Sequence, residues 1–322
     1  MIFFRFELSF KFMKQFSIIS VIISLIFLSS CRDDFELEPS FGDLEFSQDT
    51  VYLDTVFSNI GSSTYRFKVY NRSNQDIVIP SIELDQGENS NFRLNVDGVA
   101  GKSISNANIL AKDSIFVFVE VTADVEELTQ NQPSFLYTDQ VNFGSGTNLQ
   151  QVELVSLVKD AHFLFPERFE DGSTETLSLG LDAEGEEIQI DGFILDQEHL
   201  RFTNEKPYVI YGFAGVPSGK TLKVEPGARI HFHENSGIIV ASGGSMQAIG
   251  DLSSDLELME NEIVFEGDRL EPEFSDVPGQ WAAIWLTEGS TNHIFDHVTI
   301  KNSTVGILMD SNDGSGQPTL TL

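Results

Sequence analysis

The chain of 322 residues has the hydrophobic content of a globular protein, 41%, and 21% charged residues, so most of it can bury a core. Its formal net charge of −31 disfavours nucleic acid and anionic lipid surfaces as partners, because both would repel it. A single cysteine, Cys31, excludes an internal disulfide and a cysteine-rich metal site. The length is typical of about two domains.

The N-terminus has the layout of a secretory signal peptide. Lys14 precedes an apolar run of roughly a dozen residues, and small residues follow before Cys31. The run is too short for an ordinary membrane span. Residues 1–30 are therefore expected to be a signal peptide. Met13 is the better start, because residues 1–12 add an aromatic stretch that no signal peptide needs.

The end of this segment, Leu28-Ser-Ser-Cys31, resembles a bacterial lipobox. The resemblance implies lipid attachment to Cys31, and two or more acyl chains hold a protein stably on a membrane. The acidic run that starts with Arg32, Asp33 and Asp34 resembles the surface-export signal of Bacteroidota lipoproteins, with a merely solvated tether as the alternative. Residues 31–42 are expected to be this tether. Together these resemblances imply a lipid-anchored protein of the outer membrane, exposed at the cell surface.

Residues 43–160 alternate apolar and polar positions, which predicts half-buried strands. Expected strands lie at residues 43–46, 51–57, 64–70, 76–84, 91–96, 114–121, 139–143 and 151–158. Short alternating strands at this spacing are typical of a β-sandwich. Their order is similar to that of hydin/abnormal-spindle-like immunoglobulin domains, which implies an adhesion, spacer or assembly module. The runs that carry this resemblance are Val69-Tyr-Asn71, Ile77-Val-Ile79, Phe92-Arg-Leu94, Ile115-Phe-Val-Phe-Val119 and Val152-Glu-Leu154.

Residues 207–322 alternate short runs of β-favouring residues with turns of Gly, Pro, Asn and Ser. The runs align in three columns, and stacked rungs of this kind bury a continuous core. The first column holds residues 209–211, 237–240, 283–286 and 306–309; the second holds 221–224, 245–248, 292–295 and 319–322; the third holds 229–232, 262–265 and 297–300. The inward candidates are Leu222, Val224, Ile230, Phe232, Ile238, Val240, Met246, Ala248, Ile263, Phe265, Ile284, Leu286, Val298, Ile300, Ile307 and Leu320.

This region resembles right-handed parallel β-helix (pectate-lyase-like) proteins. The resemblance rests on Pro217-Ser-Gly-Lys-Thr-Leu-Lys-Val-Glu-Pro-Gly227, Gly243-Gly-Ser-Met-Gln-Ala-Ile-Gly250 and Pro278-Gly-Gln-Trp-Ala-Ala-Ile284. Residues 161–206 are expected to connect the two domains and to cap the open N-terminal end of the stack. The expected fold is thus all-β, an immunoglobulin-like β-sandwich followed by a right-handed parallel β-helix. The strand pattern stops at Leu322 without a cap, so the helix is expected to be C-terminally incomplete.

Three segments suggest ligand chemistry, and each has a plainer interpretation. Residues 214–221 fit a loose phosphate-binding loop, but strand and turn residues follow instead of the required helix, so no nucleotide is expected. His231 and His233 share one strand face and are weak metal candidates; exposed wall positions are the favoured interpretation. Residues 310–316 have the composition of a calcium loop without its acidic spacing, so a turn is favoured.

Trp281 and Trp285 are a candidate glycan platform. If Ala282 and Ile284 point inward, both indoles lie on one outward face. Burial beneath the loop of residues 267–280 is the favoured alternative, because large aromatics are usually buried.

The sequence contains no catalytic constellation of the polysaccharide hydrolases that share this fold: the patterns Asn-Thr-Asp, Gly-His-Gly and Arg-Ile-Lys are absent. The resemblances imply a lipid-anchored cell-envelope protein that binds a glycan or another envelope protein through its β-helix without catalysis. The alternative is a polysaccharide lyase or hydrolase whose active site lies in rungs beyond Leu322. No cofactor is expected. The fold alone does not decide between the two functions.

Overall fold

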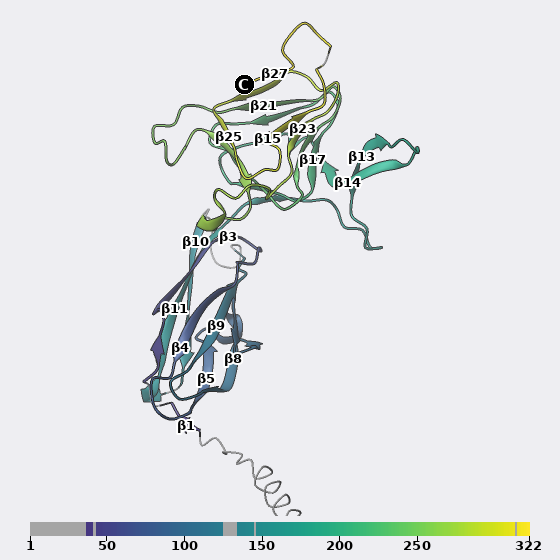
Figure 1. Ribbon diagram of the computed structural model, residues 1–322. Helices are drawn as coiled ribbons and strands as arrows, with labels where there is room; N and C mark the ends of the chain where they lie inside the picture. Colours follow the sequence, from purple (N-terminus) through teal and green to yellow (C-terminus); the bar gives the residue numbers. More distant parts are fainter. Residues whose placement is uncertain (1–36, 41–42, 125–133, 145, 313) are drawn as a thin grey trace, which may run out of the picture.

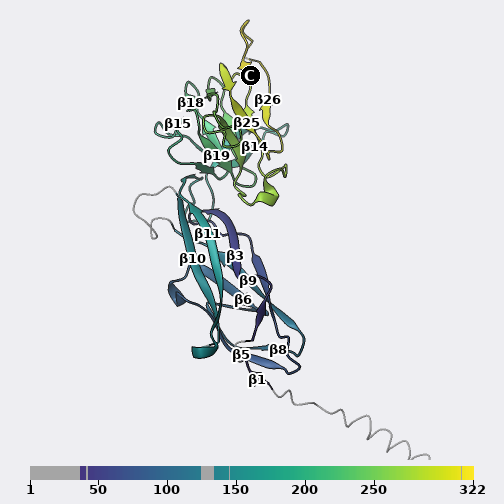
Figure 2. The same ribbon diagram turned by 90° about the vertical axis from the view of Figure 1, so that its left-hand side faces the viewer.

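The computed structural model describes residues 37–40, 43–124, 134–144, 146–312 and 314–322. The protein is all-β, and its strands form two units that lie end to end (Figures 1 and 2). We call residues 37–159 the sandwich and residues 162–321 the three-sheet unit. The expected signal peptide, Cys31 and residues 32–34 lie outside the described residues. Three short 3-10 helices are present in the described part: η1 (Gly87–Asn89), η2 (Gly146–Asn148) and η3 (Pro272–Phe274). No helix of these residues is long and apolar enough to cross a membrane.

The sandwich consists of two sheets that pack around one core. One sheet runs β1 (Glu38–Pro39), β5 (Ile77–Leu84), β10 (Ser134–Phe143), β11 (Gln150–Lys159) and β3 (Thr50–Phe57), with β8 (Ser103–Ile109) also paired to β5. The other runs β2 (Glu45–Phe46), β4 (Tyr65–Tyr70), β9 (Ser114–Val121), β6 (Phe92–Val96) and β7 (Val99–Gly101). Alternate residues of facing strands, such as Val117 on β9 and Leu154 on β11, are fully buried in the shared core.

The eight strands predicted from alternation are confirmed, but three more strands, β1, β7 and β8, were missed. β7 and β8 lie in a polar stretch, residues 99–109, whose apolar positions are too sparse to show a period of two. The expected tether, residues 31–42, is wrong in part. Glu38 and Pro39 pair with Ile77 and Val78 of β5, because the edge of that strand offers free backbone groups.

The three-sheet unit is built from short strands that visit three sheets in turn, and all of its strand pairs but one are parallel. One sheet runs β12 (His162–Leu164), β16 (Tyr208–Ile210), β19 (Arg229–Phe232), β22 (Ile263–Gly267) and β25 (Val298–Ile300). A second runs β13 (Thr176–Leu181), β14 (Glu187–Ile194), β17 (Phe213–Val216), β20 (Gly237–Val240), β23 (Ile284–Leu286) and β26 (Ile307–Met309). The third runs β15 (Arg201–Phe202), β18 (Thr221–Val224), β21 (Ser245–Ile249), β24 (His293–Asp296) and β27 (Leu320–Thr321).

Parallel pairing in register places the apolar residues of successive strands next to one another, and these residues form the core of the unit. Ile230 pairs with Phe265, and Leu222 pairs with Met246; all four are fully buried. Most of the inward candidates are buried in this way. The last five apolar residues of the stack are only partly buried: Val298, Ile300, Ile307, Met309 and Leu320.

Two assignments in this region were wrong. Residues 209–211 do not precede residues 237–240 in one column, because β16 pairs with β19 instead. A turn at Gly212, with φ of 67°, separates β16 from β17, and β17 is the true neighbour of β20. The expected connector, residues 161–206, is likewise not a separate cap. Its strands β12, β14 and β15 already pair with the sheets of the stack.

The two units meet through a small set of side chains. The ring of Phe57, at the end of β3, packs edge-on against His231 of β19 with centroids 4.8 Å apart. Phe57 is 1% exposed although it belongs to neither core. Beside it, Arg269 Nη2 donates to Ser63 Oγ over 2.9 Å and also pairs with Glu271 at 3.0 Å. Ser63 in turn donates to Glu271. A ring contact and a polar triad therefore tie the sandwich to the three-sheet unit.

Gly237 on β20 gives a direct test of the stack. A Cβ here would lie 2.3 Å from the Ala283 carbonyl oxygen and 2.8 Å from a ring carbon of Phe213. We expect Gly237→Ala to lower the free energy of unfolding of the three-sheet unit by about 1–3 kcal/mol, as overpacking does. Urea titrations followed by tryptophan fluorescence measure this, because both tryptophans lie in this unit. Gly316→Ala, which meets nothing within 4 Å, is the matched control. Equal midpoints for the two variants would refute the close packing.

Candidate binding cleft

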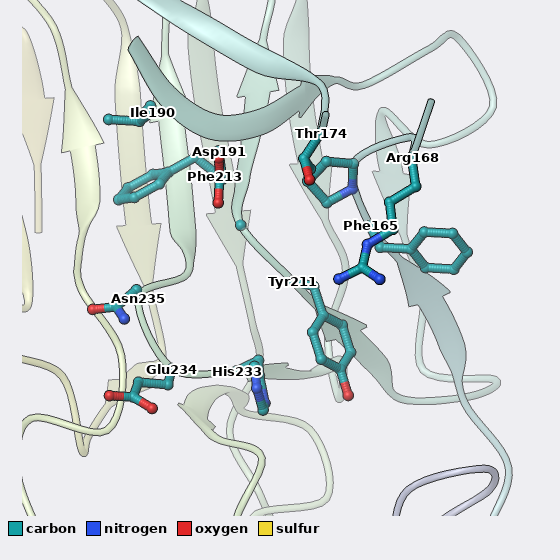
Figure 3. A pocket seen from close by; sticks show the side chains of 12 residues that line it. Phe165, Arg168, Thr174, Ile190, Asp191, Tyr211, Phe213, His233, Glu234 and Asn235 are labelled. Atoms are coloured by element: carbon teal, nitrogen blue, oxygen red, sulfur yellow. The ribbon is translucent and has the colours of Figure 1, made fainter. Parts of the chain in front are cut away.

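A cleft of about 710 Å³ lies at the corner between the first and second sheets of the three-sheet unit. We call it the corner cleft. Four separate segments line it: the chain after β12, residues 190–191 of β14, the turn between β16 and β17, and the turn that follows β19. Its lining residues are Phe165, Pro166, Arg168, Thr174, Ile190, Asp191, Tyr211, Gly212, Phe213, His233, Glu234 and Asn235 (Figure 3).

Tyr211 and His233 form the floor of the corner cleft because of the strand register. Ile210 pairs with Phe232, so the residue after each strand lies next to the other. The two rings have centroids 4.4 Å apart and are tilted by 32°. Both residues follow an inward aliphatic or aromatic side chain, so alternation directs them outward. The register thus places a phenol and an imidazole on one surface.

Asp268 fixes the imidazole from the side. His233 Nδ1 lies 2.7 Å from Asp268 Oδ2, and the Asp268 side chain is 8% exposed while that of His233 is 48% exposed. This hydrogen bond raises the pKa of His233 above its ordinary value, against the opposing effect of burial. Burial, with the charge of Asp268, raises the pKa of Tyr211 to about 12. The floor therefore offers an imidazole that holds a proton well and a phenol that remains neutral.

The walls combine aromatic rings with a cation. Figure 3 shows the Arg168 guanidinium directed into the cleft toward Tyr211, with Phe165 on the same side and Phe213 and Asp191 across from them. Arg168 is exposed, and within the described residues its side chain makes no ion pair or hydrogen bond. Phe165 is 63% exposed. A guanidinium with free donors between aromatic faces can bind an oxygen-rich ligand that also has an apolar face.

A second cleft, about 490 Å³, lies on the outer face of the second sheet. Trp285 lines it with Ile194, Ile239 and the aliphatic side chains of β13. The Trp285 Nε1 donates to Asp310 Oδ2 over 2.9 Å, which fixes the orientation of the indole. Trp285 is half-buried, so one part of the proposed glycan platform lines a real cleft.

The other part of that platform was wrong. Trp281 is 1% exposed and stacks on Phe232 inside the core, with ring centroids 4.2 Å apart. Its Nε1 donates to the Lys301 carbonyl oxygen over 2.9 Å. The outward direction of Trp281 was predicted from strand alternation. That alternation does not apply to Trp281, because β23 begins only at Ile284. The two tryptophans therefore point to opposite sides of the sheet.

The two histidines of β19 and its following turn have different environments. Alternation correctly directs both away from the core, but His231 is not an exposed wall residue: it is 5% exposed beneath Phe57 of the sandwich. Burial lowers the pKa of His231, although Glu266 lies 3.6 Å from its Nδ1. Among the described residues, no group of three or more His, Cys, Asp or Glu side chains is placed to hold a metal ion.

The two remaining sequence candidates lie between strands. Residues 214–221 run from β17 through a turn into β18, so the helix that a phosphate-binding loop requires is replaced by a strand. In residues 310–316, of which residue 313 lies outside the description, Asp310 accepts the hydrogen bond from Trp285.

Sequence reasoning found only His233 of the corner cleft. Arg168, Asp191, Tyr211 and Phe213 come from segments that are distant along the chain, and none of them belongs to a motif. The only local signal was Gly212 between two short apolar runs, which marks the turn that separates Tyr211 from Phe213.

No family model and no curated protein matches this sequence. Solved structures similar to part of the chain include a PapD-like domain of human CEP192, with 8% identity and a TM-score of 0.23, covering 38% of this chain and 88% of that one. The E. coli chaperone DraB has 12% identity and a TM-score of 0.24, with 39% and 58% covered. A family 123 glycoside hydrolase from Clostridium perfringens has 8% identity and a TM-score of 0.24, with 36% and 26% covered. Likenesses this low carry no argument about function.

The histidine pKa values provide a test of the cleft geometry. In a pH titration of the imidazole NMR signals, we expect His233 to titrate above the ordinary value near 6.5 and His231 below it. The His233–Asp268 pair should therefore stabilise the fold fully below that ordinary value and lose this contribution as pH rises through the raised pKa.

Asp268→Asn should return the pKa of His233 toward its ordinary value and leave that of His231 low. His233→Gln and His231→Gln assign the signals. If His233 titrates at its ordinary value in the unmodified protein, the ion pair does not form in solution.

Proposed function

We propose that this is a lipid-anchored protein of the cell envelope, exposed at the cell surface, that binds a glycan in the corner cleft without catalysis. In this proposal the three-sheet unit is a right-handed parallel β-helix, and the sandwich is an immunoglobulin-like spacer between the lipid on Cys31 and the β-helix. The three parallel sheets visited in turn support the first assignment, and two sheets around one core support the second. The signal-peptide layout and Arg32-Asp33-Asp34 support the location.

One observation carries the glycan proposal: the Arg168 guanidinium enters the corner cleft with its donors unused, between aromatic side chains. A sugar ring has an apolar C–H face that stacks on aromatic rings and a rim of oxygens that accept hydrogen bonds. Tyr211 and Phe213 offer such faces, and Arg168 offers up to five N–H donors. Asp191, Glu234 and Asn235 add acceptors and donors for hydroxyl groups. This mixture suits an uncharged or acidic sugar better than an apolar ligand.

Arg168→Ala tests this role without disturbing a core, since Arg168 is exposed. Loss of a hydrogen bond to a charged group costs about 1.5–3 kcal/mol, so we expect affinity for a glycan selected on an array to fall roughly tenfold to a hundredfold. Isothermal titration calorimetry measures the change. Lys223→Ala is the matched control, an exposed cation of β18 outside the cleft, and should bind as the unmodified protein does. Equal losses in both variants, or no array binding at all, would contradict the proposal.

A polysaccharide lyase or hydrolase is the second candidate function. It is favoured by the His233–Asp268 pair, whose imidazole holds a proton beside Tyr211 on the floor of the same cleft. Such a pair can act in proton transfer when a substrate lies within hydrogen-bond reach. Chain shortening of an array-selected polysaccharide, lost in a His233→Gln variant, would favour this candidate over binding alone.

The lipid anchor has its own test. We expect Cys31→Ser to move the protein from the detergent phase to the aqueous phase after Triton X-114 partition of cells that express the full chain, because acyl chains provide the membrane affinity. Metabolic labelling with a fatty acid should be lost in the same variant. An unchanged partition would contradict lipidation at Cys31, and surface proteolysis of intact cells would test exposure separately.

A further inference from the structure

A hairpin of the second sheet stands away from the body of the three-sheet unit. β13 and β14 form an antiparallel ribbon that projects to one side (Figure 1). β14 pairs with β17 only through residues 192–194, and β13 pairs with no strand besides β14 among the described residues. A free strand edge presents a row of unpaired N–H and C=O groups to which another strand can add.

The base of the hairpin is packed, whereas its outer part is exposed. Leu177 lies over two glycines: a Cβ on Gly192 would be 2.9 Å from its Cδ1, and one on Gly215 would be 3.2 Å away. Farther out, Ile188 is 43% exposed and Leu181 is 71% exposed. The ribbon is thus held in place at one end, and it carries apolar side chains beyond the part that the protein itself covers.

The charge around this ribbon indicates which partner it fits. Residues 167–191 contain nine acidic residues and one basic residue, Arg168, a net charge of −8. If a second copy of the chain paired here, two segments that each carry a charge of −8 would lie side by side, and their repulsion disfavours that pairing. A strand that carries Lys or Arg among apolar residues matches both the exposed aliphatic side chains and the acidic rim.

We propose that the free edge of β13 is a docking site for an extended, basic segment of a partner protein, which adds to the second sheet as a further strand. The register identifies the backbone groups involved. Gly192 N–H donates to the Glu175 carbonyl over 3.2 Å, so the Glu175 carbonyl faces β14, whereas the Glu175 N–H donates to the Glu167 carbonyl. Facing and outward positions alternate along an antiparallel pair, so Ser178 presents its N–H and C=O outward. This site lies outside the corner cleft and requires no glycan.

Ser178→Pro removes the outward N–H, and proline is tolerated at an edge position whose N–H faces solvent. Ser178→Ala retains that N–H and is the matched control. The probe is a short fluorescent peptide of alternating valine and lysine, with binding to the full chain followed by anisotropy. We expect the control to bind as the unmodified protein does and Ser178→Pro to bind roughly tenfold more weakly, since backbone hydrogen bonds are lost. Unchanged unfolding midpoints by tryptophan fluorescence verify that both variants fold.

Two further peptides separate strand addition from simple charge attraction. A valine–lysine peptide with alternate amides N-methylated keeps the charge but cannot form a ladder, and a valine–glutamate peptide keeps the strand but reverses the charge. Both should fail to bind. Equal binding of the N-methylated peptide, equal binding by Ser178→Pro and Ser178→Ala, or no binding of the first peptide would each overturn the proposal. Self-association through β13 that excludes the peptide would also overturn it, because the occupant would then be a second copy.

Discussion

The three-sheet unit depends on one constraint, the in-register parallel pairing of each turn of chain with the next. A strand of three or four residues cannot bury its inward side chains alone; it does so only when the turns above and below supply matching residues. Ile230 on Phe265 and Leu222 on Met246 are examples. The same register extends to the ends of the strands. It places Tyr211 beside His233 and so builds the floor of the corner cleft as a consequence of core packing.

The junction with the sandwich rests on the outward side of the same strand. Alternation along β19 sends Phe232 into the core and His231 to the surface, where Phe57 of the sandwich covers it. In the next turn of the stack, just after β22, Asp268 holds His233, while Arg269 and Glu271 bind Ser63 of the sandwich. The corner cleft and the junction are therefore adjacent, and the residues that orient the imidazole are held near the contact between the units.

The corner cleft and the projecting hairpin differ in charge. In a chain with a net charge of −31, Arg168 is the one cation within residues 167–191 and it enters the corner cleft. Asp182, Glu184, Glu186 and Glu187 lie on the projecting hairpin. A glycan and a basic peptide would thus be attracted to different parts of one region, the first by aromatic faces and a guanidinium, the second by a strand edge and an acidic rim.

Local patterns in the sequence predict most of the strands of the fold. Alternating residues such as those of β4 and β9 produce strands because one face must be buried. The repeated short runs of residues 221–300 place the later strands of each of the three sheets in the right column. Where the local pattern was weak, the predicted strands and side-chain directions were wrong. The polar β8 was missed, β16 was placed in the wrong sheet because the turn at Gly212 was not recognised, and Trp281 was directed outward by an alternation that starts only at Ile284.

The candidate site belongs to the part that only the tertiary structure decides. His233 stood out because a His-Phe-His run is visible in the sequence. The spacing of Trp281 and Trp285 suggested a glycan platform, but the structure places the two indoles on opposite sides of the sheet. Arg168, Tyr211 and Phe213 carry no local signal. Their proximity follows from which strand pairs with which, a long-range property that residue types and spacing do not specify. The sequence by itself determined most of the strands, the leader-like N-terminus and the acidic composition. The pairing of distant turns decided which side chains share a cleft.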